Sequence, residues 1–146
     1  MREGMRMRKW IVAVLALAIL ACVFVPQVMF AEDEDAICLA KTIYALGKGE
    51  TYETKLALGT VVMNRVGNRR FADTVQEVLT DQQQFPAGSR YDDESIRAAR
   101  DVLSGKRTLM PTALYYQAAD ASRMWNPENR LCSVGNYNFY DTNGNF

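Results

Sequence analysis

Two carboxylates, Glu50 and Glu53, stand in a short polar segment between two apolar runs and are the first candidates for chemistry in this sequence. Gly47 and Gly49 flank Lys48 just before them, and glycines at the end of an apolar run allow the backbone to turn. A carboxyl group held in such a turn can act as a general acid and base. Acidic residues are also common in the first turn of a helix, where they face the positive end of its dipole. The pair therefore either performs acid/base chemistry or only begins a helix.

Two predicted helices must position this turn. Apolar side chains recur at three- and four-residue spacing over residues 37–44, which predicts a helix that Asp35 caps. Thr51 can accept the first backbone N–H groups of a second helix over residues 52–66. The apolar stripe of this second helix is wide, so we expect it to be largely buried and central to the fold.

Further elements are predicted downstream of these helices. Thr74 or Asp73 can begin a short helix, and Asp92 or Asp93 can cap a longer one that Gly105 stops. After Pro111 the composition becomes β-branched and aromatic, which is typical of short strands. The predicted elements are helices over 71–80 and 94–104, a loop over 82–90, and two or three strands that include 112–117 and 137–140. This order indicates an α+β domain with a short C-terminal antiparallel β element.

Several polar and aromatic residues have both a structural and a binding interpretation. Asn64 and Arg65, at the end of the central helix, either cap its last carbonyls or contact a substrate. Phe85, next to Gln84, either fills the core or anchors a binding loop. Trp125 either fills the core or stacks on a sugar ring, whose C–H faces are apolar.

Composition excludes several classes of function. The chain has 146 residues and no histidine, so histidine-based nucleophilic, acid/base or metal chemistry is excluded. We expect no metal or nucleotide cofactor. Four of the 17 basic and one of the 17 acidic residues lie in the first 31 positions, which leaves 13 basic against 16 acidic residues beyond them. An acidic domain without a basic stripe is not typical of nucleic-acid binding.

The N-terminal segment predicts export. Residues 1–9 are basic, and an uninterrupted apolar run from Trp10 to Val25 follows. This run is shorter than a membrane-spanning helix requires, so residues 1–31 are either a signal peptide cleaved after Ala31 or an uncleaved anchor. We therefore expect residues 32–146 to form one exported, monomeric domain that contacts the membrane only through the preceding segment.

Two cysteines, Cys38 and Cys132, lie beyond this segment. An even number of cysteines in an exported chain favours a disulfide bridge, and two separate buried thiols are the alternative. Two sulfurs without histidine do not make a zinc site.

A longer set of residues resembles the spore-cortex-lytic cell-wall hydrolase family (SleB type). In that family a turn of the pattern apolar-Tyr-small-Glu-x-Arg-Gly-Glu leads into an apolar helix that ends in Asn-Arg-Val. The residues in register without a gap are Ile43, Tyr44, Ala45, Lys48, Gly49, Glu50, Tyr52, Glu53, Asn64, Arg65 and Val66. The resemblance continues through Phe71, Thr74, Val75, Gln84, Phe85, Pro111, Ala113 to Tyr116, and Val134 to Tyr140. It covers residues 37–140.

The resemblance implies a small lysozyme-like or transglycosylase-like domain that cleaves peptidoglycan glycan strands by acid/base chemistry. Two positions depart from the family. Leu46 stands where the family has its catalytic glutamate, and Tyr137 where the family usually has histidine. Glu50 is then the candidate catalytic residue. The candidate substrate-binding residues are Tyr44, Gln84, Phe85, Tyr115, Tyr116, Trp125, Asn136 and Tyr137.

Two functional hypotheses follow from Leu46. The first is an exported peptidoglycan hydrolase of lytic-transglycosylase type in which Glu50 replaces the missing acid. The alternative is a catalytically inactive family member that binds glycan or regulates an active relative, because leucine has no proton to donate. A secreted structural or interaction protein of unrelated function remains a third possibility.

Overall fold

The structure, a computed structural model, describes residues 34–143. The first element in this part of the chain is a helix over residues 34–47. The predicted signal or anchor at residues 1–31 lies outside this part. Three further α-helices follow: α2 (Tyr52–Val66), α3 (Val75–Leu79) and α4 (Asp93–Leu103). Among the described residues, no helix has the length and apolar character needed to cross a membrane.

Side-chain caps begin α2, α3 and α4 where the sequence predicts them, whereas Asp35, the predicted cap of the first helix, lies within that helix. The Thr51 hydroxyl accepts a hydrogen bond from the Thr54 N–H at the start of α2. Thr74 accepts from Glu77 N–H at the start of α3. Asp92 accepts from Ser95 N–H at 2.7 Å at the start of α4. Each cap satisfies a backbone donor that has no partner within its own helix.

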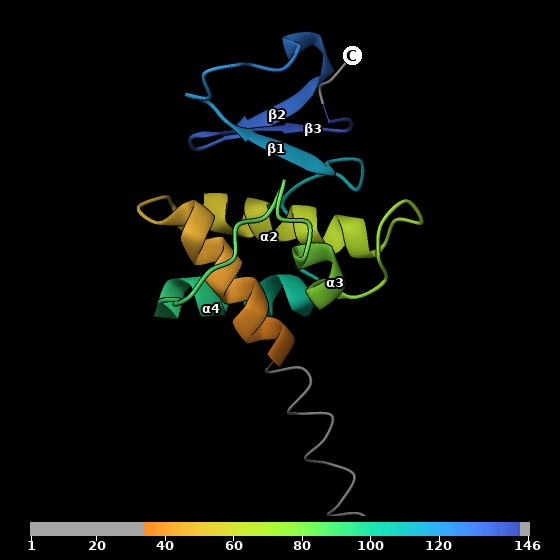
Figure 1. The fold of residues 1–146 in the computed structure, drawn as a ribbon. Coiled ribbons are helices and arrows are strands. Elements are labelled where there is room, and N and C mark those ends of the chain that lie inside the picture. The colour runs from red at the N-terminus through yellow and green to blue at the C-terminus, as the bar shows by residue number, and fades with distance from the viewer. Residues whose placement is uncertain (1–33, 144–146) are drawn as a thin grey trace, which may run out of the picture. The chain divides into compact units, whose positions relative to one another are not determined.

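The central position predicted for α2 is confirmed. Figure 1 shows α2 between the sheet and the other three helices. Ala57, Val61 and Val62 on α2 are almost fully buried. A Cβ added at Gly59 would lie 3.1 Å from Ile43 on the first helix and 3.1 Å from Val102 on α4. The small residue therefore allows both helices to pack closely against α2.

Three strands form one antiparallel sheet in the order β1-β3-β2. The strands are β1 (Tyr115–Ala118), β2 (Arg130–Val134) and β3 (Tyr137–Tyr140), and a 3-10 helix, η1 (Pro127–Asn129), precedes β2. Across the sheet Tyr115 pairs with Tyr140 and Tyr116 with Phe139. Because side chains alternate along a strand, each pair shares one face of the sheet. The α+β architecture with a short C-terminal antiparallel element is therefore confirmed.

The predicted disulfide bridge is not formed. Cys38 on the first helix and Cys132 on β2 are both free thiols and both half-buried. Burial raises the pKa of the Cys132 thiol. An even number of cysteines carries no information on the distance between them. Here Cys38 lies in the helical layer and Cys132 in the sheet.

The structure also corrects the capping role predicted for Asn64 and Arg65. The Asn64 side chain donates to the carbonyls of Met110 and Ala113, ahead of β1. Arg65 is 1% exposed, and its Nε donates to the Leu114 carbonyl at 2.8 Å. Both side chains therefore reach out of α2 and hold the segment that leads into β1.

The Asp92 cap yields a stability prediction. Hydrogen bonds from Ser95 lower the pKa of Asp92, and the charge of Lys55 adds to this effect. Asp92→Ala is expected to lower the free energy of unfolding by about 1 kcal/mol near neutral pH. A carboxyl whose folded-state pKa is lowered contributes fully above its unfolded value, about 3.9, and loses the contribution as pH falls through the folded value. The difference between the variants in urea melts should therefore shrink below about pH 4.

Asp93→Ala is the matched control, because Asp93 is the next residue and does not cap the helix. An Asp92→Ala protein as stable as the original chain at pH 7 would contradict the capping contribution.

Candidate functional site

The turn that carries Glu50 joins the first helix to α2. The Glu50 N–H donates to the Gly47 carbonyl at 3.0 Å, which closes the turn. Gly49 adopts φ +84°, a conformation that residues with a side chain rarely adopt. Thr51 then caps α2, so the Glu50 carboxylate lies at the N-terminal end of the central helix.

Glu50 contacts the turn between β2 and β3. Asn136 Nδ2 donates to Glu50 Oε1 at 2.7 Å, and the Asn136 main-chain N–H donates to Oε2 at 3.4 Å. Gly135 has φ +55°, and a Cβ there would lie 2.3 Å from Thr54 Oγ1 and 2.6 Å from Glu50 Oε2. Glycine is therefore required for this approach of two segments that are 86 residues apart.

Tyr137 joins the same cluster from β3. Its hydroxyl donates to the Leu46 carbonyl at 2.7 Å, and both side chains are half-buried against the core. Burial raises the pKa of Tyr137, and the negative charges of Glu50 and Asp120 raise it further. Leu46 and Tyr137, the two positions at which the resemblance predicts a departure from the family, are thus in direct contact beside Glu50.

Behind Tyr137, three further candidate residues pack toward the core: Tyr116, Gln84 and Phe85. The Tyr116 ring lies edge-on to Tyr137, with centroids 5.7 Å apart, and 5.8 Å from the ring of Phe85. Its hydroxyl donates to the Gln84 carbonyl, and burial raises the pKa of Tyr116. Phe85 is fully buried, which favours its interpretation as a core residue. Gln84 donates to the Tyr116 carbonyl at 3.1 Å and accepts from Arg65.

Tyr115 and Trp125 lie on the other face of the sheet. Tyr115 shares its face with Tyr140, whereas Tyr137 and Tyr116 point to the opposite face because side chains alternate along a strand. The Trp125 ring packs on Tyr140 at 5.0 Å and on Tyr115 at 6.5 Å. The structure therefore separates these two candidates from Glu50.

The two remaining candidates, Tyr44 and Glu53, make other contacts than those of Glu50, Asn136, Leu46 and Tyr137. Tyr44, on the first helix, is half-buried with the Arg90 guanidinium 5.6 Å from its ring centroid. Glu53 is exposed in the first turn of α2, which matches its helix-start interpretation.

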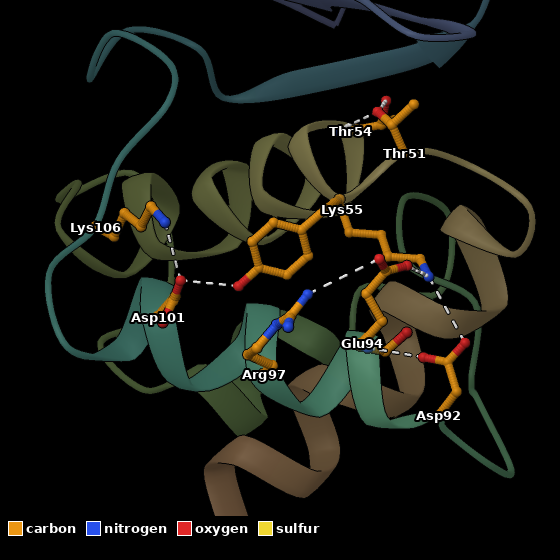
Figure 2. A network of polar contacts seen from close by, with 10 residues as sticks. Thr51, Thr54, Lys55, Asp92, Glu94, Arg97, Asp101 and Lys106 are labelled. Atoms are coloured by element: carbon orange, nitrogen blue, oxygen red, sulfur yellow. Dashed lines mark hydrogen bonds and ion pairs between the residues drawn. The ribbon is translucent and has the colours of Figure 1, made fainter.

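A polar network that the sequence analysis did not identify holds the N-terminal half of α2 on α4 (Figure 2). The side chain of Lys55 is only 4% exposed, and its Nζ lies 2.5 Å from Glu94 and 3.6 Å from Asp92. The Tyr52 hydroxyl donates to Asp101 at 2.8 Å. A lysine in the middle of an apolar stripe was the available signal, because a buried ammonium requires a carboxylate partner.

Comparison with known proteins identifies a family. Residues 49–140 match the family model described as Cell Wall Hydrolase. The chain is similar to a spore cortex-lytic enzyme of Halalkalibacterium halodurans, with 28% identity over 99 residues that make up 64% of this chain and 30% of that protein. A second spore cortex-lytic enzyme, from Oceanobacillus iheyensis, is 30% identical over 93 residues, which are 60% of this chain and 34% of that protein. The chain thus spans about a third of the length of these curated relatives.

Solved structures show the same fold. The catalytic domain of the Bacillus cereus SleB protein matches with a TM-score of 0.64 at 24% identity, over 74% of this chain and 90% of that one. The catalytic domain of the germination-specific lytic transglycosylase SleB from Bacillus anthracis matches with a TM-score of 0.65 at 24% identity, over 73% of this chain and 93% of that one. The predicted lysozyme-like fold and the predicted SleB-type resemblance are confirmed, and the chain belongs to the cell wall hydrolase family.

Proposed function

We propose that this domain cleaves the glycan strands of peptidoglycan and that Glu50 supplies the acid/base catalysis. The family is one of cell wall hydrolases, and the relatives that the chain matches are spore cortex-lytic enzymes. One observation carries the assignment to Glu50. Tyr137 donates to the carbonyl of Leu46, the residue that the resemblance places at the acid position, and its neighbour Asn136 donates to Glu50 Oε1 at 2.7 Å.

The chemistry would require one carboxyl group in two protonation states. The protonated Glu50 carboxyl gives its proton to the glycosidic oxygen while the bond from that oxygen to the anomeric carbon breaks. The resulting carboxylate then accepts a proton from the hydroxyl group that attacks the anomeric carbon. One carboxyl thereby serves as acid and later as base.

Glu50→Gln tests this proposal. We expect the release of soluble fragments from purified peptidoglycan to fall by about 10²–10⁴-fold, because glutamine keeps the shape of the side chain but has no proton to transfer. The products are separated by chromatography and identified by mass spectrometry.

Glu53→Gln is the matched control, since Glu53 is exposed in the neighbouring helix turn. We expect it to cleave at the rate of the original chain. A Glu50→Gln protein with an unchanged rate would remove Glu50 from the mechanism.

The second candidate function is glycan binding without cleavage, either alone or in regulating an active relative. Two observations favour it: Leu46 is a hydrocarbon, and both oxygens of Glu50 face N–H groups of Asn136. Co-sedimentation with insoluble peptidoglycan separates the two functions. A chain that sediments with the polymer but releases no fragments over long incubation is a binder.

The place of action follows from the substrate. Peptidoglycan lies outside the cytoplasmic membrane, and the basic and apolar residues 1–31 would deliver the domain there as a signal peptide or an anchor. The domain would act as a monomer, with the glycan strand as its partner.

A further inference from the structure

Asn136 makes two unequal contacts with the Glu50 carboxylate. Its side-chain Nδ2 lies 2.7 Å from Oε1, and its main-chain N lies 3.4 Å from Oε2. A carboxylate only accepts hydrogen bonds, so the amide must present its nitrogen and not its oxygen. The short contact is a charge-assisted hydrogen bond, whereas the long contact is at the weak end of the range.

The turn that carries Asn136 is built for this approach. Gly135 has φ +55°, and any larger residue would drive a Cβ to within 2.6 Å of Glu50 Oε2. On the other side of Asn136, the Tyr137 hydroxyl is bonded to the Leu46 carbonyl. The backbone is therefore held on both sides of Asn136, which keeps its amide within reach of the carboxylate.

We infer that Asn136 is a positioning residue for Glu50: its amide anchors Oε1, so that Oε2 carries the proton that is transferred. The inference rests on the proposed function. In the reaction the Oε2–H bond breaks, the proton passes to the glycosidic oxygen, and the electron pair of the bond between that oxygen and the anomeric carbon goes to the oxygen. Oε2 later accepts the proton of the attacking hydroxyl, which restores the starting state. Asn136 itself exchanges no proton.

Kinetics of the full chain on soluble glycan strands test the inference. Asn136→Ala is expected to lower kcat by about 10²-fold with KM unchanged, because a loosely held acid is misplaced by the order of 1 Å. Asn136→Asp keeps the shape of the side chain but lacks its amide N–H donor, so we expect its kcat to fall at least as far. In a Glu50→Gln background, Asn136→Ala should cause no further loss, since Asn136 acts through Glu50.

Ser133→Ala is the matched control. Ser133 Oγ donates to Asn138 at 2.6 Å within the same hairpin, where it does not contact Glu50. The control should leave kcat unchanged even where it lowers the melting temperature of the protein.

Four outcomes would overturn the inference. A rise in KM alone would make Asn136 a substrate contact, and a further loss in the Glu50→Gln background would make its role structural. An Asn136→Ala enzyme equal to the original chain would remove the positioning role but leave the proposed function intact. An original chain that cleaves no glycan would remove both.

Discussion

In a Glu50→Gln background, Leu46→Glu is expected to raise the rate of glycan cleavage by about 10²–10⁴-fold, the usual contribution of a general acid. Leu46 lies at the end of the first helix, half-buried beside Tyr137 and one turn before Glu50. A carboxyl introduced there would be partly removed from water, which raises its pKa and favours the protonated form that a general acid needs. The measurement is the initial rate of fragment release from purified peptidoglycan, with the products identified by mass spectrometry.

Leu46→Gln is the control for this gain, because glutamine matches glutamate in size and polarity but has no proton to give. Only the glutamate variant should accelerate cleavage. If both variants and the original chain bind glycan without cleaving it, the domain is a binder and the loss of the acid is not its only departure from an enzyme.

Arg65→Met is expected to lower the free energy of unfolding by about 2–6 kcal/mol, because two acceptors lose their donor at a cost of about 1–3 kcal/mol each. Arg65 is the largest of the fully buried side chains in the part of the chain that the structure describes. Its two terminal nitrogens donate to Asp81 at 2.9 Å and to Gln84 at 3.1 Å. Its guanidinium carbon also lies 4.6 to 4.9 Å from the ring centroids of Phe71, Phe85 and Tyr115.

Methionine fills most of this space but leaves the Leu114 carbonyl and the Gln84 amide without their donor. Burial lowers the pKa of Arg65, and Asp81 opposes this effect. Arg65→Lys keeps the charge but not the planar guanidinium group with its several donors. We expect its free energy of unfolding to fall by roughly half as much as that of Arg65→Met. Urea melts measure all three proteins. Equal stability of Arg65→Met and the original chain would show that the contacts contribute nothing net.

Local sequence was sufficient for the order of the helices and strands, although α3 begins at Val75 and β1 at Tyr115 and not at the predicted residues 71 and 112. The caps Thr51, Thr74 and Asp92 lie where a short polar side chain precedes an apolar repeat, and helices begin there. Aromatic and β-branched residues after Pro111 became strands. These features depend on neighbours within about one helical turn or one strand, so the order of residue types contains them.

Residues far apart in the sequence decided the site. Glu50 is held by Asn136 at a separation of 86 residues, and Tyr137 reaches Leu46 across 91. Spacing could not show that Trp125 packs on the sheet face opposite to Tyr137, since this depends on strand register.

The sequence by itself determined the order of the helices, the caps at Thr51, Thr74 and Asp92, the presence of C-terminal strands and the absence of histidine. The tertiary structure alone decided which groups meet: Asn136 with Glu50, Arg65 with three rings, and two cysteines with no partner. The physical reason is the separation along the chain over which each kind of interaction acts. Backbone hydrogen bonding and capping act between near neighbours, whereas burial and side-chain pairing depend on how the whole core packs.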